Sequence, residues 1–227
     1  MYRRIIQLLF CLIFKILFLL LTRVRITGRE YIPRQGGFLV AANHLSIIEV
    51  PLVYCLIDRR DVTGLVARKH QKNLFFRLMV DSLGGIWISR DEIDTQALRT
   101  ARDYLKSGGV IGIAPEGTRS PTGALQEAKT GVAFLADQAR VQILPVAISG
   151  TWQITREILT LRRPAIHVNF GKPFLLPPID RKNRDKDLKN NTEEIMCNLA
   201  ALLPPENRGV YANHPRVEEL LQTSGSI

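Results

Sequence analysis

The sequence predicts an α/β fold: a single domain with a mostly parallel central sheet flanked by helices, plus an N-terminal apolar membrane-associating helix. Short apolar segments alternate with helix-like segments of about 10–15 residues. The 227 residues suffice for one sizeable domain. An almost uninterrupted apolar stretch at the N-terminus precedes these alternating segments. We expect the helix at 1–22, the α/β domain at 23–206 and a loosely ordered C-terminal tail at 207–227.

The N-terminal stretch, residues 5–21, is apolar except for Gln7 and Lys15. It lies at the short limit for a transmembrane helix, and no signal-peptide cleavage site follows it. Gln7, Cys11 and Lys15 are spaced by four, so they share one helical face. The pattern is typical of a helix in the membrane interface, or of one packing a weakly polar stripe on the protein; a buried core helix is the alternative. Arginines flank the stretch at both ends, as suits an anionic membrane: Arg3, Arg4, Arg23 and Arg25.

The remaining elements follow in order, and Gly and Pro mark most of their ends. We expect strands at 24–27, 38–42, 62–67, 85–88, 110–114, 143–149 and 165–170. We expect helices at 50–57, 71–80, 95–106, 127–140 and 185–203.

The net charge of +10 favours anionic partners. Nucleic acid is not among those expected, because the basic residues are dispersed and their densest run, 181–189, is interrupted by Asp185 and Asp187. The three cysteines have neither disulfide-framework nor metal-site spacing, so no metal or cofactor is expected. A reducing compartment fits them, which places the protein at the cytoplasmic face of the cell membrane.

The first candidate loop, 43–49, follows a predicted buried strand and contains His44 and Glu49. An imidazole accepts a proton near neutral pH, and a carboxylate can fix its tautomer and stabilise the imidazolium. Pro51 marks the first turn of the next helix, so His44 is expected in the turn before it, within reach of Glu49. The alternative is a helix-capping box formed by Ser46 and Glu49. The residues of this loop favour neither interpretation over the other.

The second candidate loop, 115–120, follows the predicted strand at 110–114. Arg119 can grip a phosphate with two parallel hydrogen bonds, while Thr118, Ser120 and backbone N–H groups can add more. Glu116 can orient Arg119 or accept a hydrogen bond from a glycerol hydroxyl. A plain turn with a solvated salt bridge is the alternative.

Together these motifs make the chain resemble the glycerolipid acyltransferase family, typified by the 1-acylglycerol-3-phosphate acyltransferases. Five segments match in the family's order, across roughly 24–171: 43–49 as the first motif, 85–90 as the second, 115–120 as the third, the lysine-x-glycine at 129–131, and 144–147 as the fourth.

The resemblance implies that His44 deprotonates the acceptor hydroxyl, which then attacks a thioester carbonyl without an acyl-enzyme, and that Glu49 holds His44. The implied partners are a lysophospholipid acceptor and an acyl-CoA or acyl carrier protein donor, and the expected product is phosphatidic acid. The candidate substrate-binding residues are Arg90, Glu116, Gly117, Thr118, Arg119, Lys129 and Pro145.

One position departs from the family, whose first motif usually carries aspartate where this chain has Glu49. The extra methylene lets the carboxylate reach farther and costs more side-chain order. Two other functions stay open. One is a member of the same family acting on another lysolipid or a glycolipid, although an acceptor without phosphate would leave Arg119 unexplained. The other is a non-catalytic basic protein of the membrane surface.

Overall fold

A computed structural model describes residues 2–89, 94–160 and 162–224. Its centre is a seven-stranded sheet in the order β1-β7-β6-β2-β5-β3-β4. Neighbouring strands are parallel except β6 and β7, so the predicted mostly parallel sheet is confirmed. The strands are β1 (Arg23–Thr27), β2 (Phe38–Ala42), β3 (Val62–Ala67), β4 (Ile86–Ile88), β5 (Val110–Ile113), β6 (Gln142–Ser149) and β7 (Ala165–Phe170).

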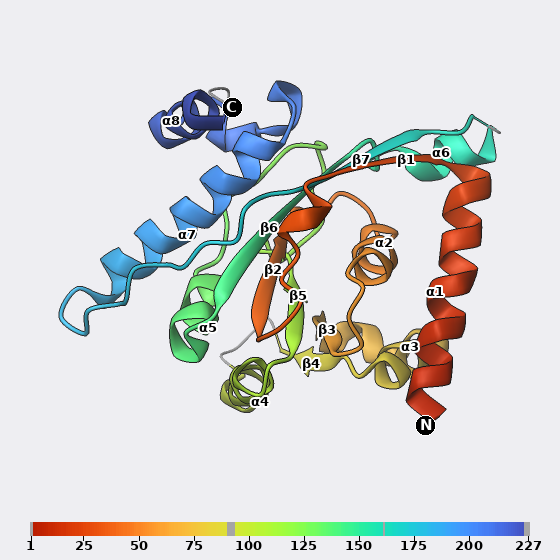
Figure 1. The fold of residues 1–227 in the computed structure, drawn as a ribbon, viewed down its shortest axis with the longest axis horizontal. Helices are drawn as coiled ribbons and strands as arrows, with labels where there is room; N and C mark the ends of the chain where they lie inside the picture. Colours follow the sequence, from red (N-terminus) through yellow and green to blue (C-terminus); the bar gives the residue numbers. More distant parts are fainter. Residues whose placement is uncertain (1, 90–93, 161, 225–227) are drawn as a thin grey trace.

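Helices cover both faces of this sheet (Figure 1). Helices α4, α5 and α7 pack on one face, while α2 and α6 pack on the other and α1 lies outside α2. The α-helices are α1 (Tyr2–Leu21), α2 (Glu49–Leu56), α3 (Leu74–Leu83), α4 (Thr95–Lys106), α5 (Gly131–Ala139), α6 (Ile154–Leu159), α7 (Arg184–Leu202) and α8 (Pro215–Ser224). Short 3-10 turns are η1 (Arg29–Tyr31), η2 (Arg68–Lys72), η3 (Pro205–Asn207) and η4 (Gly209–Tyr211).

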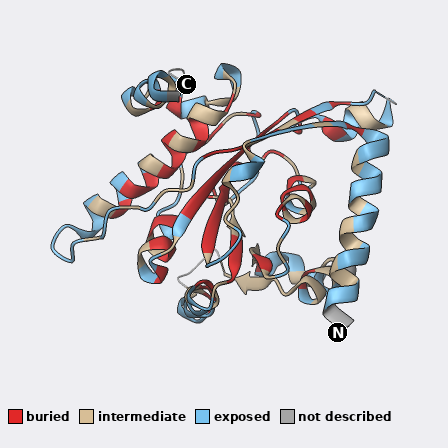
Figure 2. Cartoon of the chain, in the orientation of Figure 1, coloured by how far each residue is buried: buried red, intermediate tan, exposed pale blue. Residues whose placement is uncertain are grey.

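Strand β2 shows why the central strands are apolar throughout. Side chains alternate across a strand, so Phe38 and Val40 enter the core under α2 while Leu39 and Ala41 enter the core under α4, α5 and α7. All four are buried, and Figure 2 shows the central strands as the buried interior. Parallel strands covered on both faces require this continuous apolar run.

Helix α1 packs only one of its faces on the protein. Gln7 and Cys11 are half-buried on it, and the Phe10 ring meets the Tyr54 ring of α2 edge-on, with centroids 5.8 Å apart. Its outer leucines and isoleucines are exposed (Figure 2). The window Arg4–Leu21 has a mean hydropathy of 2.4, with none of it buried. The core-helix alternative is therefore wrong, and the polar stripe lies on the protein, although Lys15 itself is exposed.

Several segments differ from the sequence prediction. The helix expected at 71–80 is α3 (Leu74–Leu83), and α6 and α8 are helices that the sequence did not predict. Helix α5 begins at Gly131 rather than at 127, because Lys129 N–H donates to the Pro115 carbonyl (2.9 Å) and holds the preceding residues as an extended loop. The expectation of a loose tail at 207–227 is corrected up to residue 224, since Tyr211 and Val217 are buried and α8 packs on α7. Val217, Leu220 and Leu221 have the spacing of a helix face. The polar residues that follow them in the sequence made this pattern hard to recognise.

Candidate active site

The loop after β2 is fixed first by Asn43. Its amide side chain donates to the Ile148 carbonyl (2.8 Å) and accepts from Ile148 N–H (2.7 Å) on the adjacent strand β6. Asn43 is buried, so this reciprocal pair forms away from solvent. The chain therefore leaves the sheet at a set point, and the next residue, His44, is presented at the carboxyl end of the sheet.

The carboxylate of Glu49 holds the His44 ring. Glu49 Oε2 lies 3.0 Å from His44 Nδ1 and accepts a hydrogen bond from Leu45 N–H at 2.8 Å. Glu49 Oε1 accepts a hydrogen bond from the Thr151 hydroxyl. The Glu49 side chain is 3% exposed and that of His44 20%. Glu49 is thus a buried acceptor for three donors, and the imidazole is the more exposed member of the pair.

The capping-box alternative for this loop does not form. Helix α2 begins at Glu49 after Ile48, and no side chain caps it. The Ser46 carbonyl accepts a hydrogen bond from Glu49 N–H (3.4 Å), which closes a turn. This turn brings the Glu49 side chain back toward His44, as expected from the position of Pro51.

The second candidate loop meets the first because β2 and β5 are adjacent and parallel, so their carboxyl ends share one edge of the sheet. His44 N–H donates to Glu116 Oε1 (3.1 Å), and the His44 carbonyl accepts from Ser120 N–H (2.7 Å). Glu116 Oε2 accepts from Gln126 N–H (3.0 Å). Both backbone polar groups of His44 are therefore bonded to the segment 115–126, called the 115–126 loop below.

Glu116 is buried, and burial raises the pKa of its carboxyl group. Both of its oxygens accept hydrogen bonds from the backbone, of His44 and of Gln126. Glu116 is predicted from the sequence to bind substrate, whereas its contacts are those of a residue that holds the two loops together.

The exposed part of the 115–126 loop carries the groups expected to bind a phosphate. Thr118 and Arg119 are exposed, and Lys129 is exposed nearby. Gly117 has a φ of 71°, and a Cβ there would lie 3.3 Å from Lys129 Cδ, so glycine lets the lysine stem lie against the turn. Among the described residues, neither Thr118 nor Arg119 has a side-chain hydrogen bond or ion pair, which leaves both able to bind a ligand.

Two further candidates were predicted from the sequence, Arg90 and Pro145. Arg90 falls outside the described residues. Pro145 is buried in β6 opposite Ala41, and its ring packs beside Gly171, where a Cβ would lie 2.8 Å from Pro145 Cγ. Pro145 thus lies within the sheet, at the register position of Ala41 on β2.

Thr151 is the site residue that the sequence analysis missed. It is fully buried just beyond the carboxyl end of β6 and donates to Glu49. Only the strand order, which places β6 beside β2, brings it to a residue so distant in the chain. No local pattern marks it. The Glu49 carboxylate therefore contacts both His44 and Thr151.

The two buried cysteines, Cys55 and Cys197, are not suited to act as nucleophiles. Burial raises the pKa of the Cys55 thiol and raises that of Cys197 to about 12, so both remain protonated thiols. Among the described residues, no group of three His, Cys, Asp or Glu side chains could hold a metal ion.

The chain is thus an α/β protein with a histidine–carboxylate pair at the carboxyl edge of its mostly parallel sheet. Comparison with known proteins gives the family. The acyltransferase family profile matches residues 23–149, so the chain belongs to the acyltransferase family. The chain is similar to the 1-acyl-sn-glycerol-3-phosphate acyltransferase of Borreliella burgdorferi, at 26% identity over 57% of this chain and 52% of the relative. It is also similar to that of Cocos nucifera, at 31% identity over 66% and 49%.

A solved structure extends the likeness beyond the matched residues. The 1-acyl-sn-glycerophosphate (LPA) acyltransferase PlsC from Thermotoga maritima superposes with a TM-score of 0.63 and 25% identity, over 85% of this chain and 78% of that chain. The chain spans about half the length of the Borreliella and Cocos relatives. The fold is therefore shared, and the activity of this chain is argued from its own site below.

Proposed function

We propose that this chain transfers a fatty acyl group from a thioester carrier to the free hydroxyl of 1-acylglycerol-3-phosphate, giving phosphatidic acid at the cytoplasmic face of the cell membrane. The carrying observation is the His44–Glu49 contact of 3.0 Å, in a loop whose backbone is bonded to the 115–126 loop. The names of the similar proteins support the same acceptor.

The mechanism begins with the tautomer of His44. A carboxylate is only an acceptor, so the contact with Glu49 favours the tautomer of His44 with its proton on Nδ1 and with Nε2 free to accept one. Nε2 takes the proton of the acceptor hydroxyl as its oxygen attacks the thioester carbonyl. Glu49 stabilises the imidazolium that forms. When the C–S bond breaks, the proton passes from Nε2 to the departing thiolate, which restores neutral His44.

The acceptor phosphate is assigned to the exposed part of the 115–126 loop. Arg119 provides two parallel donors for phosphate oxygens, and Thr118 and Lys129 lie in the same exposed region. The carrier is assigned as acyl-CoA or acyl carrier protein, both thioesters of the required chemistry. Helix α1 is assigned to the membrane, because its outer face is apolar and exposed.

The test is an acyl-transfer assay on the purified protein with vesicles, using both donors and a panel of lysolipids with and without phosphate. His44→Ala should lower kcat by roughly 10²–10⁴-fold, the usual contribution of a general base. If the protein transfers acyl groups only to acceptors without phosphate, the alternative acceptor, another lysolipid or a glycolipid, is correct. If the parent protein transfers no acyl group with any pair of donor and acceptor, it is a non-catalytic membrane protein.

A further inference from the structure

The C-terminal segment is bonded to the loop that carries the proposed phosphate site. The Asn207 carbonyl accepts from Leu125 N–H (2.9 Å), and Val210 N–H donates to the Leu125 carbonyl (3.3 Å). The Asn207 side-chain amide donates to the Gly123 carbonyl (2.6 Å). At Gly209 a Cβ would lie 1.9 Å from the Leu125 carbonyl oxygen, so the two backbones approach as closely as glycine allows.

These contacts continue directly to the histidine. Leu125 is buried, and the residue after it, Gln126, donates its N–H to Glu116. The other oxygen of Glu116 accepts from His44 N–H. A shift of the backbone at 123–126 would therefore be passed to Glu116, which also precedes the exposed turn carrying Arg119. The C-terminal segment and the catalytic loop are therefore joined by hydrogen bonds through Glu116, in addition to the bond from Ser120 N–H to the His44 carbonyl.

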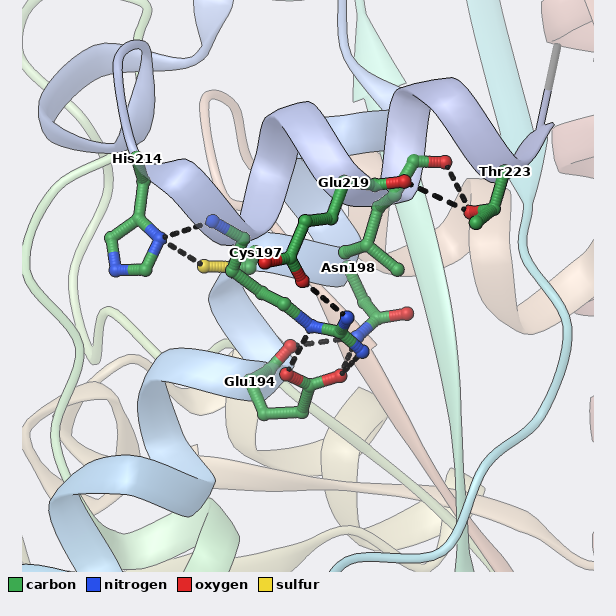
Figure 3. A network of polar contacts seen from close by, with 8 residues as sticks. Glu194, Cys197, Asn198, His214, Glu219 and Thr223 are labelled. Atoms are coloured by element: carbon green, nitrogen blue, oxygen red, sulfur yellow. Dashed lines mark hydrogen bonds and ion pairs between the residues drawn. The ribbon is translucent and has the colours of Figure 1, made fainter.

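A second set of contacts fixes the C-terminal segment to helix α7 (Figure 3). Arg216 donates to both carboxylate oxygens of Glu194, each at 2.9 Å. His214 Nδ1 accepts from Arg216 N–H (3.1 Å) and lies 3.4 Å from Cys197 Sγ. Val217 is fully buried beneath them. The C-terminal segment that contacts the 115–126 loop is thus held by α7. The buried residues of α7 belong to the core on the face of the sheet covered by α4, α5 and α7.

We propose that residues 205–217 form a C-terminal brace that positions the 115–126 loop for the acceptor phosphate, with Asn207 as its positioning residue. The part of this proposal that concerns the acceptor rests on the proposed function. Asn207 touches no substrate in this assignment. It acts through Gly123 and Leu125, which set the path of the loop between Glu116 and the phosphate-binding turn.

The test compares Asn207→Asp and Asn207→Ala in the full-length protein with the parent. Aspartate keeps the shape but turns an acceptor toward the Gly123 carbonyl, whereas alanine only removes the donor. Asn213→Ala is the matched control, because Asn213 is exposed in the same segment. Both Asn207 variants should raise the KM for the phosphorylated acceptor about two- to tenfold, the usual worth of one hydrogen bond. The donor KM should change by less than about twofold, and the control should match the parent.

Hydrogen exchange gives a readout that does not depend on activity. Exchange of the Leu125 and Gln126 amides should accelerate in both Asn207 variants and not in Asn213→Ala. Unchanged exchange at these amides overturns the brace. Faster exchange with equal changes in both KM values overturns its role toward the acceptor. If the parent protein transfers no acyl group while exchange responds as expected, the proposed function fails and the brace stands.

Discussion

At the residue scale, the carboxylate of Glu49 accepts three hydrogen bonds and joins the loop after β2 to the residues after β6. It accepts hydrogen bonds from His44 and Leu45 after β2 and from Thr151 after β6. A buried charge requires such partners, because desolvation penalises any lone pair left without a donor. Orientation of His44 therefore depends on Thr151, although the hydroxyl does not touch the imidazole.

This dependence predicts a difference between two substitutions of Thr151. Thr151→Val keeps the shape and removes the donor to Glu49, and a hydrogen bond to a charged group is worth about 1.5–3 kcal/mol. We expect kcat to fall roughly tenfold or more. Thr151→Ser keeps the hydroxyl and should stay within about threefold of the parent. Steady-state kinetics and thermal unfolding of both variants provide the check, and equal kcat values for Val and Ser would contradict a role for the hydroxyl.

Arg119 allows a second prediction at this scale. Arg119→Lys keeps the charge but loses the planar pair of donors that matches a phosphate. The KM for the phosphorylated acceptor should rise by about tenfold, while the donor KM stays nearly constant. Lys106→Arg, at an exposed site at the end of α4, controls for a change between these two residue types. A change confined to the donor KM would reverse the assignment of the two substrates.

At the element scale, the sequence predicted the parts of the site that lie close together in the chain. His44 and Glu49 are five residues apart, so their contact was one of the two arrangements expected for this loop, and the structure shows that it forms. The contact of Glu49 with Thr151, and those of the 115–126 loop with Asn207, depend on strand order and on the packing of the C-terminal segment. No local pattern encodes such distant pairings, so they required the structure.

Helix α1 gives the prediction at the element scale. Its inner face packs against α2, so substitutions on the outer face test membrane binding without disturbing that contact. Leu8 and Leu12 are 62% and 56% exposed. The double substitution Leu8→Glu and Leu12→Glu should weaken binding to vesicles at least tenfold, because burial of each leucine is worth about 1.5–3 kcal/mol.

Leu175→Glu is the matched control for this measurement. Leu175 is 63% exposed in the chain between β7 and α7, away from α1. Its substitution should leave vesicle binding unchanged in co-sedimentation at high salt, where attraction of the basic residues to anionic lipid is screened. Equal loss of binding in both variants, or in neither, would show that a surface other than α1 holds the protein on the membrane.

At the scale of the whole molecule, the predicted single α/β domain forms with a largely parallel sheet, and the C-terminal segment is part of its packing rather than a free tail. Short apolar runs bounded by turn residues predicted the strands, because both are local properties of the chain. The order of the strands, the antiparallel pairing of β6 with β7 and the docking of α8 are set by global packing. Val217 illustrates what local sequence patterns do not predict, since its burial depends on the packing of α8 against α7.

The docking of α8 predicts a pH dependence of stability. Hydrogen bonds from Arg216 lower the pKa of Glu194 below its ordinary value of 4.5. A carboxyl group whose pKa is lower in the folded state stabilises the fold above its unfolded pKa, and this contribution is lost as pH falls through the folded pKa. Arg216 is 42% exposed, so we expect only about 0.5–1 kcal/mol at pH 7.

Urea unfolding of the parent and of Arg216→Ala between pH 7 and pH 3 measures this contribution. The difference in unfolding free energy should be constant down to about pH 5 and should shrink toward zero below pH 4.5, because protonated Glu194 no longer attracts Arg216. Arg102→Ala is the control, since Arg102 pairs with the exposed Asp103 on the surface of α4 and should contribute little at any pH. A parent–variant difference that persists unchanged at pH 3 would mean that Arg216 holds α8 through the packing of its stem rather than through its charge.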